Sequence, residues 1–272
     1  MHHISFPSFK HTVKGYYEGH KRDLPWRKTK NPYYILISEM MLQQTQASRV
    51  IEPYKRFVRH FPTISSLAKA PFKEVFSLWS GLGYNRRARY LKDAADLIVR
   101  RYNGRIPRTR KELESLPGVG SYTAGAVLAF AFNRREPLIE TNIRTVFIHF
   151  FFGGREKVSD AELLPYIEKT LPKDEPREWL SALMDYGAML KETRRDAGTR
   201  SVHYVKQSKF KGSRRELRGR ILKILLRESR MTKRALIKKL ALKDTAHDVD
   251  HILTTLEDEA LITKRGNTIA LA

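Results

Sequence analysis

Two glutamates stand in settings where a carboxyl group could take part in chemistry. Glu39 lies in the run YYILISEMML, residues 33–42, one helical turn before Gln43. Burial among apolar side chains disfavours the charged form of a carboxyl group and raises its pKa, so an enclosed Glu39 would hold a proton that it can donate. The alternative is a solvated glutamate on a helix surface, and the apolar neighbours argue against it.

The second glutamate, Glu140, stands alone before the run TNIRTVFIHFF. An ionised carboxylate beside a reacting centre stabilises positive charge that develops there. Glu140 also precedes a helical pattern, and an acidic side chain at this place can accept hydrogen bonds from the first backbone N–H groups of the helix. Both interpretations of Glu140 therefore stay open.

The segment between the two glutamates contains LPGVG, residues 116–120, with helical patterns on both sides. This arrangement predicts a helix-hairpin-helix. Gly118 and Gly120 let the backbone approach a phosphate closely, and the N–H groups that open the second helix from Ser121 onward are anion donors. An ordinary tight turn is the alternative, and the charge of the chain favours the DNA clamp.

Composition limits the possible partners. The 272 residues include 52 Lys and Arg against 29 acidic residues, a net charge of +23. Such a charge favours a polyanion, with nucleic acid first, over a protein that is merely basic. We find no run of about 20 apolar residues and no signal-peptide pattern, so we expect no membrane association and a cytoplasmic location. Cysteine is absent, which excludes disulfides and cysteine-ligated metal centres.

Apolar residues recur at helical spacing from Phe9 to Leu190, interrupted by short Gly and Pro positions. We expect a mostly α-helical domain of two lobes over residues 1–190. Residues 191–213 predict a basic linker or DNA-facing loop. Residues 214–272 contain three amphipathic patterns and two β-prone runs around a Gly-Asn turn, which predicts a small winged-helix-like domain.

The motifs LPW, SEMMLQQTQ, WSGLGY, LPGVG and MDYGAM, in this order, resemble those of the helix-hairpin-helix DNA glycosylases and most closely the MutY-type adenine glycosylases. The resemblance covers roughly residues 5–190. It implies a base excision repair enzyme that flips a base out of duplex DNA and hydrolyses its N-glycosidic bond. Adenine opposite 8-oxoguanine or guanine is the expected target.

The resemblance also implies residue roles. Glu39 would protonate the departing base, and Glu140 stands where the family usually has an aspartate that stabilises the sugar cation. Asn142 matches an asparagine of the site. Lyase members carry a lysine at position 122, where this chain has tyrosine, so we expect a monofunctional glycosylase with no lyase activity.

Further matches concern the duplex. Gln43, Gln44 and Tyr84 match residues that wedge into DNA, and Arg27 would contact the flipped base together with Tyr122. Phosphate contacts are expected from basic residues directly after Tyr84 and in the loop after MDYGAM, namely Arg86, Arg87, Lys191, Arg194, Arg195 and Arg200. A buried Tyr84 and a solvated basic loop are the corresponding alternatives.

The chain departs from the family in two places. The four cluster cysteines that usually follow MDYGAM are missing, so no iron–sulfur cluster is expected, and no cofactor or metal beyond an alkali ion at the hairpin. We also expect the family's usual C-terminal domain, which recognises 8-oxoguanine, to be missing, with the winged-helix-like residues 214–272 in its place. We expect a monomer acting on duplex DNA. Two alternatives remain open: a thymine or uracil glycosylase for mismatches with guanine, and a non-catalytic DNA-binding protein.

Overall fold

The computed structural model of the protein describes residues 4–194, 197–206, 209–240 and 246–272. The chain folds into two compact units. The first contains the chain up to Glu39, Arg108–Ser115 and Val119–Lys206, and the second contains Met40–Pro107, Leu116–Gly118 and Gln207–Ala272. Helix α2 (Pro32–Leu42) therefore begins in the first unit and ends in the second.

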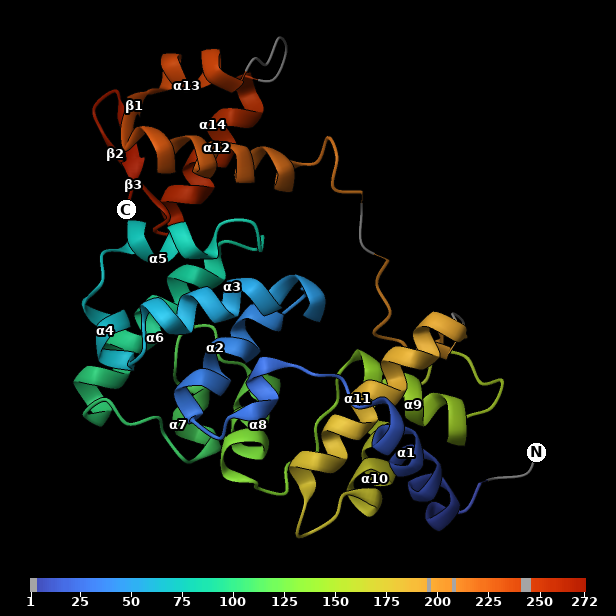
Figure 1. Ribbon diagram of the computed structural model, residues 1–272. Helices are drawn as coiled ribbons and strands as arrows, with labels where there is room; N and C mark the ends of the chain where they lie inside the picture. The colour runs from blue at the N-terminus through green and yellow to red at the C-terminus, as the bar shows by residue number, and fades with distance from the viewer. Residues whose placement is uncertain (1–3, 195–196, 207–208, 241–245) are drawn as a thin grey trace. The chain divides into compact units, whose positions relative to one another are not determined.

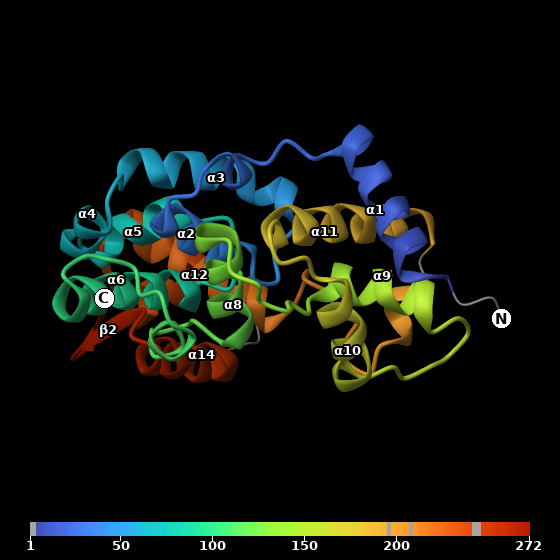
Figure 2. The ribbon, with the colours of Figure 1, turned by 90° about the horizontal axis from the view of Figure 1, so that it is seen from below.

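The first unit is helical. Helix α11 (Pro176–Thr193) packs against both α1 (Phe6–His20) and α9 (Thr141–Phe151), as Figures 1 and 2 show. Its core contains a cluster of aromatic rings, in which Phe9 meets Phe151 at 5.0 Å and Trp179 at 5.7 Å in edge-to-face arrangements. The elements that lie wholly in this unit are α1 (Phe6–His20), η1 (Pro25–Lys28), α7 (Arg110–Glu114), α8 (Ser121–Phe132), α9 (Thr141–Phe151), α10 (Asp160–Thr170), α11 (Pro176–Thr193) and η2 (Ala197–Arg200).

Helix α8 is apolar on all sides, and every residue from Thr123 to Phe130 is buried. A helix of this composition belongs in a protein interior. Gly125 permits a close approach, because a methyl group there would lie 2.9 Å from the Leu138 side chain. This packing holds the first turn of α8, which carries Tyr122, in a fixed position.

In the second unit, α6 packs against α4 and α5. Trp79, at the end of α5, is fully buried and meets the Phe57 ring edge-on at 6.3 Å. The helices of this part are α3 (Ala47–His60), α4 (Ile64–Lys69), α5 (Phe72–Trp79) and α6 (Arg86–Tyr102).

The same unit also contains the small C-terminal fold, in which three helices pack with a three-stranded sheet. The strand order is β1-β3-β2, all antiparallel. Strands β2 and β3 form the expected hairpin, with Gly266 in the left-handed region at its turn. The elements are α12 (Arg214–Glu228), β1 (Arg230–Thr232), α13 (Lys233–Leu240), α14 (Ala246–Asp258), β2 (Ile262–Arg265) and β3 (Thr268–Leu271).

These elements confirm the expected fold class, which is mostly α with a small winged-helix-like domain. Sequence patterns do not predict strand β1, because its three residues carry little pattern and pair only with β3, far along the chain. The boundaries expected near residues 190 and 214 stay predictions. None of the helices in the described ranges is long and apolar enough to span a membrane.

Candidate active site

Glu39 lies in the second half of α2, at the end of the segment that belongs to the first unit. Its relative exposure is 6%, and Ile35, Leu36 and Met40 around it are at most 2% exposed. Burial raises the pKa of Glu39 from an ordinary 4.5 to about 8, and the negative charge of Glu140 adds to the rise. The carboxyl group therefore keeps its proton at neutral pH, as a proton donor requires.

Glu140 is the N-cap of α9. One carboxylate oxygen accepts a hydrogen bond from the backbone N–H of Ile143 at 3.0 Å, and the other accepts one from the Asn142 amide at 3.2 Å. The capping interpretation is thus confirmed. It does not compete with a role in chemistry, because the same carboxylate acts electrostatically on Glu39 and on Tyr122.

Tyr122, in the first turn of α8, shares this environment. Its pKa is raised well above 10, first by burial and then by the charges of Glu39 and Glu140. The phenol is therefore neutral and can donate a hydrogen bond. The first unit brings together Glu39 of α2, Tyr122 of α8, and Glu140 and Asn142 at the start of α9, three segments that lie apart in the sequence.

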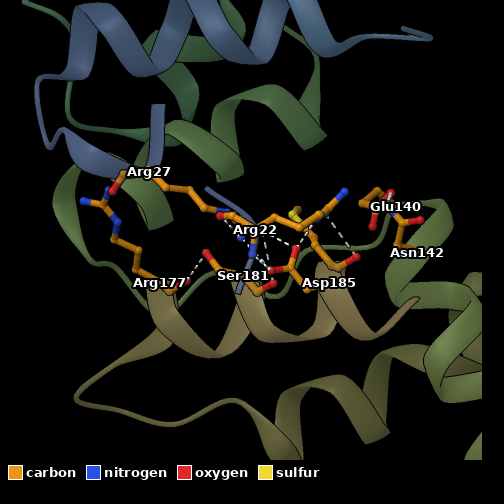
Figure 3. Close-up of polar contacts among 8 residues, drawn as sticks. Arg22, Arg27, Glu140, Asn142, Arg177, Ser181 and Asp185 are labelled. Carbon is orange, nitrogen blue, oxygen red and sulfur yellow. Dashed lines mark hydrogen bonds and ion pairs between the residues drawn. The ribbon is translucent and has the colours of Figure 1, made fainter. Parts of the chain in front are cut away.

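A second polar cluster involves Arg27, for which the resemblance implied contact with the flipped base. Its guanidinium donates two hydrogen bonds of 2.7 Å to the two oxygens of Asp185, and a third to the Ser181 carbonyl. Arg22 donates to Asp185 as well. Figure 3 shows these side chains along α11, with Glu140 and Asn142 at the edge of the view.

Asp185 is the centre of this cluster, and it is not among the site residues that the sequence predicts. It is 2% exposed. Burial alone would raise the pKa of Asp185, but the hydrogen bonds and charges of Arg27 and Arg22 outweigh burial and lower it. The signal in the sequence is an acidic residue inside the otherwise apolar stretch LMDYGAM, at a position that a helix buries. Arg27 stays a predicted base contact, held in place by Asp185.

The residues expected to wedge into DNA belong to the second unit. Gln44 and Tyr84 both have left-handed backbones, with φ of 52° and 46°. Such conformations are uncommon for residues other than glycine, asparagine and aspartate, and they cluster at functional sites. The Tyr84 hydroxyl accepts a hydrogen bond from Arg215 of α12 at 3.2 Å. Gln43 donates from its amide to the Gly118 carbonyl at 3.2 Å, which ties it to the hairpin turn.

Arg87 needs a correction. It is only 6% exposed, and its guanidinium donates to the backbone carbonyls of Met40, Met41 and Gln43. A guanidinium enclosed in this way stabilises the end of α2 and is not available to a phosphate. Arg200 is also buried, at 8% exposure. The neighbouring Arg86 is exposed and stays a predicted phosphate contact.

At the hairpin, a methyl group at Gly118, where φ is +74°, would lie 2.7 Å from Tyr90. The position thus requires glycine for both conformation and space. Gly120 is the N-cap of α8, with no side-chain cap, and Ser121 is exposed. The anion-donor role of this helix end stays a prediction, as does the phosphate role of the exposed Arg194. Arg195 lies outside the described residues.

No group of three or more His, Cys, Asp or Glu side chains in the described ranges could hold a metal ion. The chain contains no cysteine, so it cannot ligate an iron–sulfur cluster through thiolates. The site that the structure brings together thus consists of carboxyl, phenol and amide groups.

Fold and site together define a class of protein. Residues 37–169 match the model of the HhH-GPD superfamily base excision DNA repair proteins. The chain is 35% identical over 275 residues to the adenine DNA glycosylase of Mycobacterium tuberculosis H37Rv, covering 92% of this chain and 88% of that protein. The chain belongs to the HhH-GPD superfamily, and the resemblance inferred from the motifs is confirmed.

Two further relatives refine this placement. The adenine DNA glycosylase of Buchnera aphidicola subsp. Baizongia pistaciae is 38% identical over 184 residues, and the chain spans about half, 52%, of its length. The solved structure of a thermostable thymine-DNA glycosylase is 30% identical, with a TM-score of 0.62, covering 70% of this chain and 89% of that one. Relatives named for adenine and for thymine are therefore both similar to this protein.

Proposed function

We propose that this protein is a monofunctional DNA glycosylase that hydrolyses the N-glycosidic bond of a mispaired adenine in duplex DNA. The observation that carries the proposal is the pair of carboxyl groups in the first unit. Glu39 is buried and protonated at neutral pH. Glu140 is a carboxylate held by two hydrogen bonds. Bond cleavage at a glycosidic carbon needs one group of each kind.

In the proposed reaction, Glu39 gives its proton to the flipped base while the bond between the base and the sugar carbon breaks. The bonding electron pair leaves with the base, and the sugar becomes an oxocarbenium ion. The Glu140 carboxylate stabilises that cation. Water then adds to the same carbon and releases a proton to the solvent, which leaves an abasic site, and Glu39 takes up a proton from the solvent to restore the acid. The amide of Asn142 keeps the Glu140 carboxylate oriented.

The test uses a panel of duplexes that each carry one mispair, including adenine opposite 8-oxoguanine and opposite guanine. We expect single-turnover release of adenine and abasic sites that alkali converts to strand breaks. Strands that are cut without alkali, or a covalent adduct trapped by borohydride, would contradict the monofunctional assignment. Tyr122 offers no amine at the position where lyase members carry one.

A second candidate is removal of thymine or uracil from mismatches with guanine, which the similarity to the thermostable thymine-DNA glycosylase favours. The same panel separates the two, because the released base identifies the substrate. A protein that binds the duplexes and releases no base would instead be the non-catalytic DNA-binding protein. The burial of Glu39 favours the enzyme, since a decayed site has no reason to keep an enclosed acid.

A further inference from the structure

Lys191 lies near the end of α11, in the first unit, and is half-buried. Gly187, one turn earlier on the same face of the helix, touches the start of α9. A methyl group at Gly187 would collide with the Asn142 carbonyl and lie 2.7 Å from the Asn142 side chain. Residues four apart share one face of a helix. Lys191 therefore extends from the face of α11 that is pressed against the first turn of α9, which Glu140 caps.

The electrostatic surroundings of Lys191 agree with this placement. Burial lowers the pKa of the Lys191 ammonium, the charge of Glu140 opposes that fall, and the charge of Arg22 reinforces it. Among the residues that the structure describes, none forms a hydrogen bond or an ion pair with the Lys191 ammonium. A cation that is partly desolvated without a direct partner is costly to the fold, so its position calls for an explanation.

The other charged or titratable groups that act on Glu140 come from three elements. Glu39 of α2 and Tyr122 of α8 are neutral at neutral pH. Arg144, one turn along α9, acts on Glu140 too, but its guanidinium donates two hydrogen bonds, of 2.6 and 2.7 Å, to Asp160 of α10. Its charge is therefore largely offset by a carboxylate of its own. Lys191 adds a cation from α11 that forms no ion pair with another described residue.

We propose that Lys191 is a positioning residue whose positive charge keeps the Glu140 carboxylate ionised in the active site. The inference rests on the proposed glycosylase function. A carboxylate can stabilise the sugar cation only while it is ionised, and a nearby cation disfavours its protonation. Lys191 lies in the segment after MDYGAM, where the MutY-type family usually has the cysteines of an iron–sulfur cluster. The cation that Lys191 supplies is therefore a feature of this chain and not of the family pattern.

The test compares Lys191→Met and Lys191→Arg with the wild-type protein in single-turnover excision across a pH series. Lys191→Met removes the charge and keeps much of the length. We expect its acid limb to move to higher pH by about one unit, because a carboxylate that loses a neighbouring cation is protonated more readily. Lys191→Arg should keep the wild-type profile. The exposed Lys173→Met serves as the matched control and should behave as the wild type.

Several outcomes would overturn the proposal. An unmoved acid limb in Lys191→Met, or a shifted one in Lys191→Arg, shows that the charge does not act on Glu140. Weaker duplex affinity at an unchanged rate and profile assigns Lys191 to a phosphate instead. A borohydride adduct that Lys191→Met abolishes makes Lys191 a nucleophile. If Lys191→Met does not fold, Lys191→Gln, which also removes the charge, takes its place in the same comparison.

Failure of the proposed function is distinguishable from failure of this inference. If the wild-type protein releases no base, the glycosylase proposal fails. The pKa of the Glu140 carboxyl group, measured by NMR titration in the wild type and in Lys191→Met, then decides the inference without any activity. A higher pKa in the variant supports it, and an equal pKa overturns it.

Discussion

The acidic side chains of the candidate active site and those of the C-terminal fold differ in whether they form ion pairs. In residues 214–272, four acidic side chains on or next to α14 form ion pairs, namely Arg214–Asp248, Arg218–Glu259, Lys233–Asp250 and Lys264–Glu257. In the first unit, neither Glu39 nor Glu140 forms an ion pair with another described residue. A paired carboxylate is fixed in its charged form, whereas an enclosed, unpaired carboxyl group such as that of Glu39 can hold a proton and donate it.

The difference separates stability from chemistry. Exposed ion pairs add little stability. Their carboxylates also stay ionised, so they have no proton to donate. A buried acid such as Glu39 lowers the stability of the fold once it ionises. Buried acids of this kind are therefore found mainly at functional sites. We therefore expect large functional effects at Glu39 and Glu140 and small ones at the paired acids.

The largest effect is expected from Glu39→Gln, which removes the proton donor and keeps the shape. General acid catalysis contributes roughly a hundredfold to ten-thousandfold in rate, so we expect single-turnover excision to fall by about a thousandfold. Duplex affinity should stay within a few-fold. The matched control is Asp250→Asn, which removes one exposed, paired acid of the C-terminal fold and should leave excision unchanged. Full turnover by Glu39→Gln would remove Glu39 from the mechanism.

The next effect concerns Glu140, where capping and chemistry coincide. Glu140→Gln can still accept a hydrogen bond from Ile143 but has no charge, so excision should fall by about a hundredfold while the melting temperature changes little. Glu140→Asp keeps the charge and should keep or raise activity. Excision rates and thermal melts of both variants separate the roles. Full activity with a lowered melting temperature in Glu140→Gln would leave capping as the only role.

A third effect is the pH dependence that burial of Glu39 imposes. With its pKa raised to about 8, Glu39 loses its proton above that pH, so the excision rate should fall on the alkaline side. The unfolded chain releases this proton near 4.5. The free energy of unfolding should therefore decline as pH rises from about 4.5 to about 8.

Glu39→Gln removes this penalty. The stability of the variant relative to the wild type should rise across the same pH window and stay level below it. Thermal melts of both proteins at a series of pH values measure the difference. A constant difference between about pH 5 and about pH 8 would show that Glu39 is ionised in the native protein, and the contrast with the paired acids would be lost.

The smallest effect is expected from removing residues 214–272. Residues 200–272 contain 18 Lys and Arg against 8 acidic residues, and the ion pairs around α14 leave an excess of cations for phosphates. Truncation should weaken binding to matched and mispaired duplexes alike and reduce the salt slope by about one unit per lost contact. Single-turnover excision at saturating enzyme should survive.

Two other results would change this view of the C-terminal fold. Selective loss of the preference for the opposite base would mean that residues 214–272 recognise that base. Unchanged affinity and salt slope would point instead to a protein partner. Binding measured over a salt series, with matched and mispaired duplexes in parallel, separates the three outcomes.

The sequence by itself determined the fold class and the superfamily, and it predicted Glu39 as the proton donor. Helical periodicity, the LPGVG turn and the apolar neighbours of Glu39 are local patterns. Such patterns can be recognised in the sequence before any tertiary contact is known. The Gly-Asn turn likewise predicted the hairpin of β2 and β3, because a turn sets the register of the strands beside it.

Only the tertiary structure decided which charges act on one another. Asp185 meets Arg27 across 158 positions of the chain, and Lys191 acts on Glu140 because Gly187 lets α11 approach α9 closely. Arg87 has the sequence context of a phosphate ligand beside other arginines, yet the carbonyls at the end of α2 enclose it. Burial and charge coupling depend on distances in space, and residue types and spacing along a chain do not contain those distances.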